Sequence, residues 1–468
     1  MKGWNVGTDT VTAPRRSGGR WISHWDPEDA AFWRDTGQRV ANRNLWSSIF
    51  AEHLGFSVWS LWSVLVLFMT AENGFTFSAS QKFLLVSLVA LVGAVLRVPY
   101  TLAVPKLGGR NWTLISVAAL LVPTVLAIAL IQRPETPYWL FLVLAMTAGV
   151  GGGNFSSSMA NISFFFPERK KGWALGLNAG GGNVGVATIQ LLGLGVIAAF
   201  GVAGAFLLPL VYLPLLVVAL FVAWRYMDNI AGARSDIGAQ IATLRERHFW
   251  IMSFLYIGTF GSFIGFGFAF GLVLQSQFDR TPLEAAMVTF LGPLVGSLSR
   301  PFGGQLADRF GGAVITLWNF IAMLAFTGII LLAAVQQSLW LFTAGFVAVF
   351  ILTGIGNGST YKMIPSIYAA RAEDMVAAGT PRESATAYAK RISGAMLGLV
   401  GAMGALGGVG INLVFRESFG ATGSSIPAFI AFIAFYAVCI VVTAVVYVRR
   451  PHISAAPTTT AAPRVTTS

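Results

Sequence analysis

Twelve long apolar stretches constrain this 468-residue chain more than any other feature of its sequence. A helix that crosses the hydrocarbon core of a bilayer needs about 20 consecutive apolar residues. Stretches of this length lie near residues 46–70, 82–105, 112–132, 137–160, 173–199, 204–225, 249–276, 283–303, 314–334, 338–362, 391–414 and 425–448. Only 11% of the residues are charged, against about 25% in soluble domains. The sequence therefore predicts an all-α integral membrane protein with twelve transmembrane helices.

The spacing of the stretches predicts two pseudo-symmetric six-helix bundles, because a longer connection follows the sixth stretch. A second longer connection runs over 364–390. The expected organisation is a cytoplasmic leader over 1–45, an N-terminal six-helix bundle over 46–225, a central cytoplasmic linker over 226–248, a C-terminal six-helix bundle over 249–448 and a disordered cytoplasmic tail over 449–468.

The basic residues predict the orientation of the chain. If both termini are cytoplasmic, 25 of the 31 Lys and Arg residues fall on that side and four fall outside. Such an excess is the positive-inside signal of a multi-pass inner-membrane protein. The net charge of +12 is thus explained by topology, and we expect a lipid bilayer rather than nucleic acid as the surrounding partner.

An internal repeat supports the two-bundle plan. Arg97 and Arg300 each follow a glycine by four residues, and each precedes a loop in which a basic residue is followed, after one position, by two glycines. Both features keep one offset of 203 residues. The second loop, Gly304–Gly312, resembles the cytoplasmic loop signature of the major facilitator superfamily. We expect its Asp308 and Arg309 to bridge helix ends and hold one conformer.

The two arginines predict an anionic substrate. An arginine within a membrane span is costly and is normally functional and paired, yet of nineteen acidic residues only Glu52 lies clearly inside a span. A small anion is then the natural partner, and the planar guanidinium suits the oxygens of a flat oxyanion. The alternative is that each arginine reaches the membrane surface or binds backbone carbonyls.

Glycine-rich segments in the fifth and eleventh stretches predict close helix packing, and their residues are candidates for gating. They contain Asn178, Gly180, Gly181, Gly182 and Gly185 in the fifth stretch and Gly401, Gly404, Gly407 and Gly408 in the eleventh. The fifth stretch also holds Asn183, whose amide we favour over that of Asn178 as a donor to the anion.

Aromatic residues offer further candidates. Tyr256 and Phe260 are four residues apart and share a helix face. The Tyr256 hydroxyl could donate to an anion while Phe260 and Phe155 clamp a flat ion, although packing is the usual role of such aromatics in membrane helices.

Residues 22–448 resemble the NarK-type nitrate/nitrite porters. The resemblance rests on the leader Trp25–Trp33, on Arg43–Trp46, on the run Gly153–Pro167, and on the two glycine-rich signatures. It implies that Arg97 and Arg300 bind nitrate and nitrite, and that Asn183, Tyr256, Phe260 and Phe155 line the same site. It also implies a monomer in a bacterial-type inner membrane, coupled functionally to a nitrate reductase. Ala179, Lys362 and the pair Glu52 and His53 depart from the family pattern.

Three mechanisms remain open at this point. Closing two arginines into a dry cavity without an anion is costly, which favours nitrate/nitrite exchange by rocker-switch alternating access. Proton-coupled symport would use Glu52 and His53, because histidine titrates near neutral pH; the alternative is that both residues reach cytoplasmic water. A channel or a transporter-like sensor is the third reading. One cysteine and four histidines, without a nucleophile–base pair, predict neither an enzyme nor a cofactor or metal site.

Overall fold

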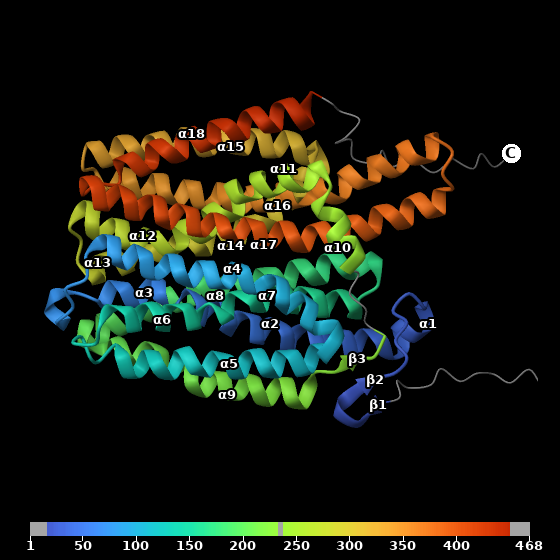
Figure 1. Ribbon diagram of the computed structural model, residues 1–468, viewed down its shortest axis with the longest axis horizontal. Coiled ribbons are helices and arrows are strands. Elements are labelled where there is room, and N and C mark those ends of the chain that lie inside the picture. The colour runs from blue at the N-terminus through green and yellow to red at the C-terminus, as the bar shows by residue number, and fades with distance from the viewer. Residues whose placement is uncertain (1–15, 233–236, 450–468) are drawn as a thin grey trace, which may run out of the picture. The chain divides into compact units, whose positions relative to one another are not determined.

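The computed structural model describes residues 16–232 and 237–449, which are almost entirely helical (Figure 1). Twelve helices in these residues are long and apolar enough to cross a membrane. They are Ala30–Phe68, Ala79–Leu107, Gly109–Leu130, Tyr138–Phe165, Glu168–Phe200, Val202–Tyr226, Arg247–Phe278, Pro282–Phe310, Gly312–Val335, Leu339–Ala377, Arg382–Thr422 and Ile426–Val448. Each predicted stretch overlaps one of these helices, so the predicted helix count and fold class are confirmed.

Several of these helices consist of shorter elements that join end to end. The earlier elements are α1 (Ala30–Phe32), η2 (Trp33–Gly37), α2 (Gln38–Ser60), α3 (Trp62–Phe68), η3 (Ala71–Asn73), α4 (Ala79–Leu107), α5 (Gly109–Leu130), α6 (Tyr138–Ala148), α7 (Val150–Phe165), α8 (Glu168–Phe200), η4 (Val202–Phe206) and α9 (Leu207–Tyr226). The later elements are α10 (Ile237–Leu244), α11 (Arg247–Tyr256), η5 (Ile257–Gly261), α12 (Ser262–Phe278), α13 (Pro282–Thr289), α14 (Leu291–Phe310), α15 (Gly312–Val335), α16 (Leu339–Ala377), α17 (Arg382–Thr422), α18 (Ile426–Thr443) and η6 (Ala444–Val448).

The chain divides into two compact units. Unit 1 comprises Met1–Ser235, Gly261–Ser297 and Ala405–Ala428, and unit 2 comprises Asp236–Phe260, Leu298–Gly404 and Phe429–Ser468. Within unit 1, α2 packs against α7 and α8, while α4 packs against α7 and α5 against α9. Within unit 2, α15 packs along α16. The six-helix bundles with the residue bounds expected above stay a prediction.

A small sheet ties the leader to the start of the linker in unit 1. Strand β1 (Arg16–Ser17) leads through η1 (Gly18–Arg20) to β2 (Trp21–Ile22), which pairs in parallel with β3 (Asn229–Ile230). Next to β3, the buried carboxylate of Asp228 accepts hydrogen bonds from the side chains of Arg20, Arg43 and Asn44. The described part of the leader, residues 16–45, therefore belongs to the structured part of unit 1. The predicted disordered tail lies outside the described residues, apart from its first residue.

The predicted connection over 364–390 is mostly helical. Helix α16 continues to Ala377 and α17 begins at Arg382, so the two form a hairpin that projects beyond the neighbouring helices of unit 2 (Figure 1). Its charged side chains pair, Arg371 with Glu246 at 2.6 Å and Arg382 with Glu373 at 2.9 Å. The hydropathy of the sequence predicted only the apolar part of each helix. The polar part that follows has the composition of a solvent-exposed loop, so hydropathy could not identify it as helical.

The internal repeat has a backbone counterpart. The loops after α4 and α14 each turn at a glycine with positive φ, +87° at Gly108 and +89° at Gly311. Residues other than glycine rarely adopt this conformation. The two glycines keep the 203-residue offset of Arg97 and Arg300, so each arginine lies eleven residues before an equivalent turn.

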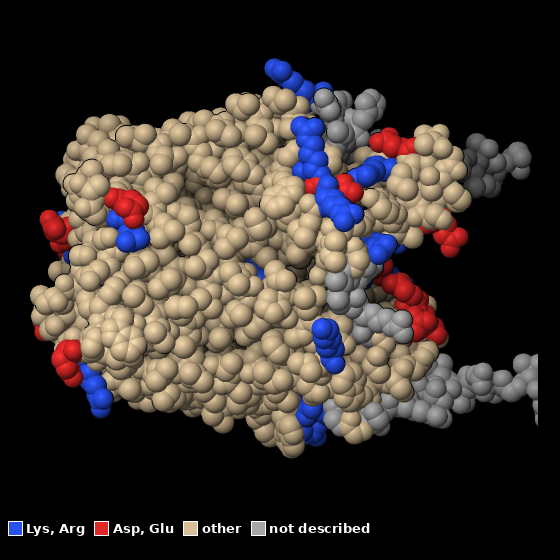
Figure 2. All heavy atoms as spheres, viewed as in Figure 1, with Lys and Arg blue, Asp and Glu red and all other residues tan. Residues whose placement is uncertain are grey.

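The surface has the character expected in a bilayer. Figure 2 shows charged side chains near the helix ends, with almost none along the middle of the helices. Large apolar side chains are exposed on the membrane-length helices, among them Val122, Val217, Phe221 and Trp318. Water would penalise such a surface, whereas lipid tails match it.

Candidate functional site

Arg97 lies in the interior of unit 1. It belongs to α4 and its side chain is fully buried. Its guanidinium carbon is 4.7 Å from the centroid of the Phe155 ring on α7, and the Phe155 ring meets Phe56 edge-on at 6.0 Å. The structure thus brings together Arg97 and Phe155, two of the predicted site residues, in a cation–π contact that holds the guanidinium against a flat apolar wall.

Arg300 lies in an aromatic cluster of unit 2 formed by Tyr256, Phe260 and Tyr361. It belongs to α14 and is half-buried. Its Nη2 donates a hydrogen bond to the hydroxyl of Tyr256 at 3.2 Å, and its guanidinium is 5.9 Å from the centroid of Phe260. Tyr256 and Phe260 stack with their centroids 5.3 Å apart. Nη1 of Arg300 is buried and has no hydrogen-bond partner among the described residues. This N–H donor therefore has no acceptor in the described part of the chain.

Tyr361 is a site residue that the sequence reasoning missed. It lies on α16, with its ring centroid 5.9 Å from the Arg300 guanidinium and 5.4 Å from the Tyr256 ring. Its hydroxyl donates to the backbone oxygen of Leu397 on α17 at 3.0 Å. No pattern in the sequence singled it out, because a lone tyrosine in an apolar helix most often serves packing.

Asn178 and Asn183 have different surroundings. Asn178 on α8 is fully buried and donates from Nδ2 to Glu52 Oε2 and to Ser158 Oγ, both at 2.6 Å. Asn183 is buried too, and its Oδ1 accepts no hydrogen bond from the described residues. Asn178 therefore serves Glu52, and its role as a gating residue of the signature stays a prediction.

Glu52 and His53 also have separate surroundings. The side chain of Glu52 is only 1% exposed, so it does not reach water as the alternative reading supposed. Ser158 Oγ donates to its Oε2. His53 Nδ1 lies 3.1 Å from the backbone oxygen of Gly181. Both residues face α8, where the first glycine-rich signature lies.

The glycines of the first signature have unequal roles. A Cβ on Gly182 would overlap Glu52 Oε1, and a Cβ on Gly185 would overlap the backbone oxygen of His53. A Cβ on Gly180 would meet no atom within 4 Å. Close approach to α2 therefore explains Gly182 and Gly185 but not Gly180.

The second signature follows the same logic on α17. A Cβ on Gly404 would overlap the Tyr256 ring, and one on Gly408 would crowd α12. Gly407 is buried as well, whereas a Cβ on Gly401 would meet no atom within 4 Å. Gly404 is thus the member of this signature that lies against Tyr256, the hydrogen-bond partner of Arg300.

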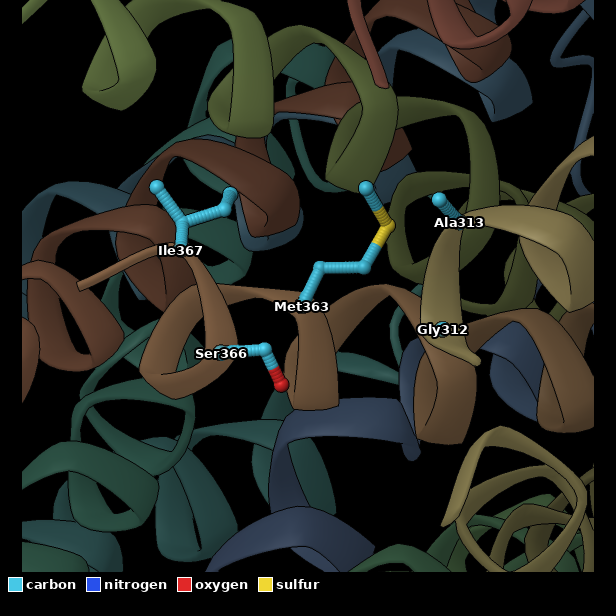
Figure 3. Close-up of a pocket in the computed structure, with 5 residues that line it drawn as sticks. All are labelled: Gly312, Ala313, Met363, Ser366 and Ile367. Carbon is cyan, nitrogen blue, oxygen red and sulfur yellow. The ribbon is translucent and has the colours of Figure 1, made fainter. Parts of the chain in front are cut away.

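The predicted loop Gly304–Gly312 is helical up to Phe310, the last residue of α14, and this segment pairs with α16. Asp308 forms an ion pair with Lys362, while the guanidinium of Arg309 lies 5.1 Å from the Phe310 ring. The pocket beside this loop, lined by Gly312, Ala313, Met363, Ser366 and Ile367, has no charged side chain (Figure 3). It therefore offers an anion no charged partner.

Comparisons with known proteins agree with this architecture. The model of the Major Facilitator Superfamily matches residues 45–388. The chain is 40% identical over 448 residues to the nitrate/nitrite transporter NarU of Escherichia coli (strain K12), covering 92% of this chain and 96% of that protein. It is 35% identical over 379 residues to the "Probable nitrate/nitrite antiporter NarK2" of Thermus thermophilus, covering 75% of this chain and 84% of that protein.

A solved structure shares the fold. The crystal structure of a D-xylose-proton symporter matches with a TM-score of 0.63 and 12% sequence identity, over 86% of this chain and 97% of that chain. This likeness concerns the arrangement of helices alone. Together with the relatives above, it leads to one identification: the chain belongs to the major facilitator superfamily, in the family of NarK-type nitrate/nitrite transporters, and is a multi-pass membrane transporter rather than an enzyme.

Proposed function

We propose that this transporter carries nitrate and nitrite and exchanges one anion for the other by rocker-switch alternating access, with Arg97 and Arg300 as ligands of the anion. The names of its relatives support the choice of substrate. The observation that carries the proposal is Arg300, whose buried Nη1 lacks a hydrogen-bond partner among the described residues. A planar oxyanion fits both this donor and the flat aromatic rings around it.

The chemistry of the groups around Arg300 favours a flat ion over a round one. Guanidinium presents parallel N–H donors in a plane, which matches two oxygens of nitrate or nitrite. The Tyr256 hydroxyl lies 3.2 Å from Arg300 Nη2 and can donate its own proton to an oxygen of the ion. Phe260 and Phe155 then bound the ion from apolar sides, and Asn183 adds an amide donor.

Exchange follows from the electrostatics of a buried arginine. A carrier that closes around an uncompensated cation in a dry interior meets a large desolvation cost. Bound nitrate or nitrite supplies negative charge and lowers this cost in either direction. An anion on the opposite side should therefore speed the return step.

Cellular setting completes the proposal. A nitrate reductase consumes nitrate and forms nitrite, so an exchanger would supply its substrate and remove its product. The excess of basic residues on one side supports an inner-membrane protein with both termini in the cytoplasm. The proposed transporter acts as a monomer.

The test uses purified protein in sealed liposomes at the same pH on both sides. Vesicles loaded with nitrite should take up external nitrate at least about tenfold faster than empty vesicles, because the loaded carrier switches most readily. Protein-free liposomes measure the leak. Uptake into empty vesicles that follows an imposed pH gradient, without stimulation by internal nitrite, would instead show proton-coupled symport.

A further inference from the structure

Glu52 is a buried charge that the proposed anion site does not explain. Among the described residues the buried charged side chains are Glu52, Arg97, Arg110 and Asp228, and all four belong to unit 1. Asp228 has basic partners at the end of the leader. Glu52 and Arg97 lie within membrane-length helices, where an ionisable residue is a functional candidate by default.

The surroundings of Glu52 suit an ionised carboxylate. Oε2 accepts hydrogen bonds from Asn178 Nδ2 and from Ser158 Oγ, and both partners are donors. Hydrogen bonds to a charged acceptor are the stronger kind. Oε1 lies against Gly182, where any side chain would overlap it.

The carboxylate and Arg97 flank the same part of α7. Ser158, which binds Glu52, lies one helical turn after Phe155, whose ring contacts the Arg97 guanidinium. Residues three apart on a helix are neighbours on its surface. The carboxylate of Glu52 and the guanidinium of Arg97 therefore contact neighbouring residues of the same segment of α7.

We propose that Glu52 is the fixed countercharge of the anion site and restricts its substrates to monovalent anions. This inference rests on the proposed function, because it takes Arg97 and Arg300 as ligands of the anion. The charges of the two arginines and Glu52 sum to one positive charge. One nitrate or nitrite cancels that charge, whereas a dianion would leave the loaded carrier negative.

Protonation of Glu52 should then slow transport. When Glu52 is neutral, the carrier with a bound anion keeps one positive charge. The empty carrier with an ionised Glu52 has the same charge, and this charge opposes its change of conformation. Acidic pH should therefore act on the wild type as removal of the carboxylate does.

Several titratable or charged groups share the elements packed against α2, besides the groups of α2 itself. On α2 they are Arg39, Arg43 and His53; on η2, Arg34 and Asp35; on α4, Lys82, Arg97, Tyr100 and Lys106; on α5, Arg110; on α8, Glu168, Arg169, Lys170 and Lys171; on α9, Tyr212, Arg225 and Tyr226; and on α3 and α7 there are none. Of these, His53 is adjacent in sequence, and its Nδ1 faces Gly181 rather than Glu52.

The experiment measures nitrate/nitrite exchange in liposomes as a function of pH. Glu52→Gln keeps the shape and the hydrogen bonds but removes the charge, and we expect exchange about a hundredfold slower at pH 7.5 because one buried cation stays uncompensated. Glu52→Asp keeps the charge and should retain most of the rate. Wild-type exchange should fall toward acidic pH, and the Glu52→Gln profile should lack this decline.

Ser158→Ala is the matched control for packing. It removes one hydrogen bond from the cluster and keeps the charge, so its exchange at pH 7.5 should stay within about threefold of wild type. Gel filtration and nitrate-induced thermal stabilisation establish that each variant is folded and binds anion.

Three outcomes would overturn the countercharge. One is wild-type exchange by Glu52→Gln. Another is equal slowing by Glu52→Gln and Ser158→Ala, which would assign the cluster to packing. The third is a Glu52→Gln protein that exchanges normally and loses only uptake driven by a pH gradient, which would make Glu52 the carrier of a transported proton. Failure of the proposed function would look different, because nitrate would then neither stabilise nor exchange through the wild-type protein.

Discussion

The two repeat-related arginines differ in their immediate surroundings. Arg97 is fully buried against one ring, whereas Arg300 is half-buried among three aromatic residues and shares a hydrogen bond with Tyr256. A repeat can thus preserve the position of a charge while each copy acquires its own neighbours. We expect the two arginines to contribute unequally to affinity.

Substitution of either arginine by lysine tests the fork geometry. Arg97→Lys and Arg300→Lys keep the positive charge but lose the parallel donors, so half-saturating nitrate should rise about tenfold or more. The measurement is the concentration dependence of exchange. Arg416→Lys, in a helix end, is the control and should behave as wild type. Unchanged affinity in both site variants would remove the arginines from the binding site.

At the scale of single residues, the sequence predicted which residues are candidates for the site better than it predicted which residues they contact. Arg97 and Arg300 could be found because a charge in an apolar span is conspicuous and because the repeat places both at one offset. Tyr361 could not be found, since its role depends on the distance of 5.9 Å between its ring and Arg300. The bonding of Asn178 to Glu52 was equally hidden, because it joins residues 126 apart in the sequence.

At the scale of elements, hydropathy predicted which segments are helices but not where they end. The membrane sets the length of the apolar part, whereas the helix continues as long as its backbone and side-chain bonds are satisfied. Helix α16 has 39 residues, which corresponds to about 58 Å, about twice the thickness of a hydrocarbon core. Ion pairs such as Arg371 with Glu246 support the part beyond the apolar stretch.

Two of the four signature glycines of α17, Gly401 and Gly404, offer a matched pair for an element-scale test. Gly404→Ala should overlap the Tyr256 ring, and such overpacking costs about 1–3 kcal/mol; we expect exchange to fall about tenfold. Gly401→Ala meets open space and gains helix propensity of about 1 kcal/mol, so it should keep the wild-type rate. Exchange rates and thermal midpoints of the two variants are to be compared. Equal behaviour would show that contact with Tyr256 does not matter.

At the scale of the whole molecule, the leader is joined to the linker by a buried acid. Asp228→Ala would leave Arg20, Arg43 and Asn44 without their shared acceptor, and loss of bonds to a charged group costs about 2–3 kcal/mol. We expect a lower thermal midpoint in detergent, with Asp228→Asn intermediate. An unchanged midpoint in Asp228→Ala would mean that the leader contributes nothing to stability.

The pairing of β2 with β3 also has a consequence for biosynthesis. Arg20 and Asp228 are 208 residues apart, and a ribosome adds about 5–20 residues per second. Strand β2 therefore stays without its partner β3 for roughly 10–40 s, while the six helices between them are synthesised. Completion of the sheet then shows that the chain of these six helices has been synthesised, so the short parallel strand pair marks a defined stage in the assembly of the protein.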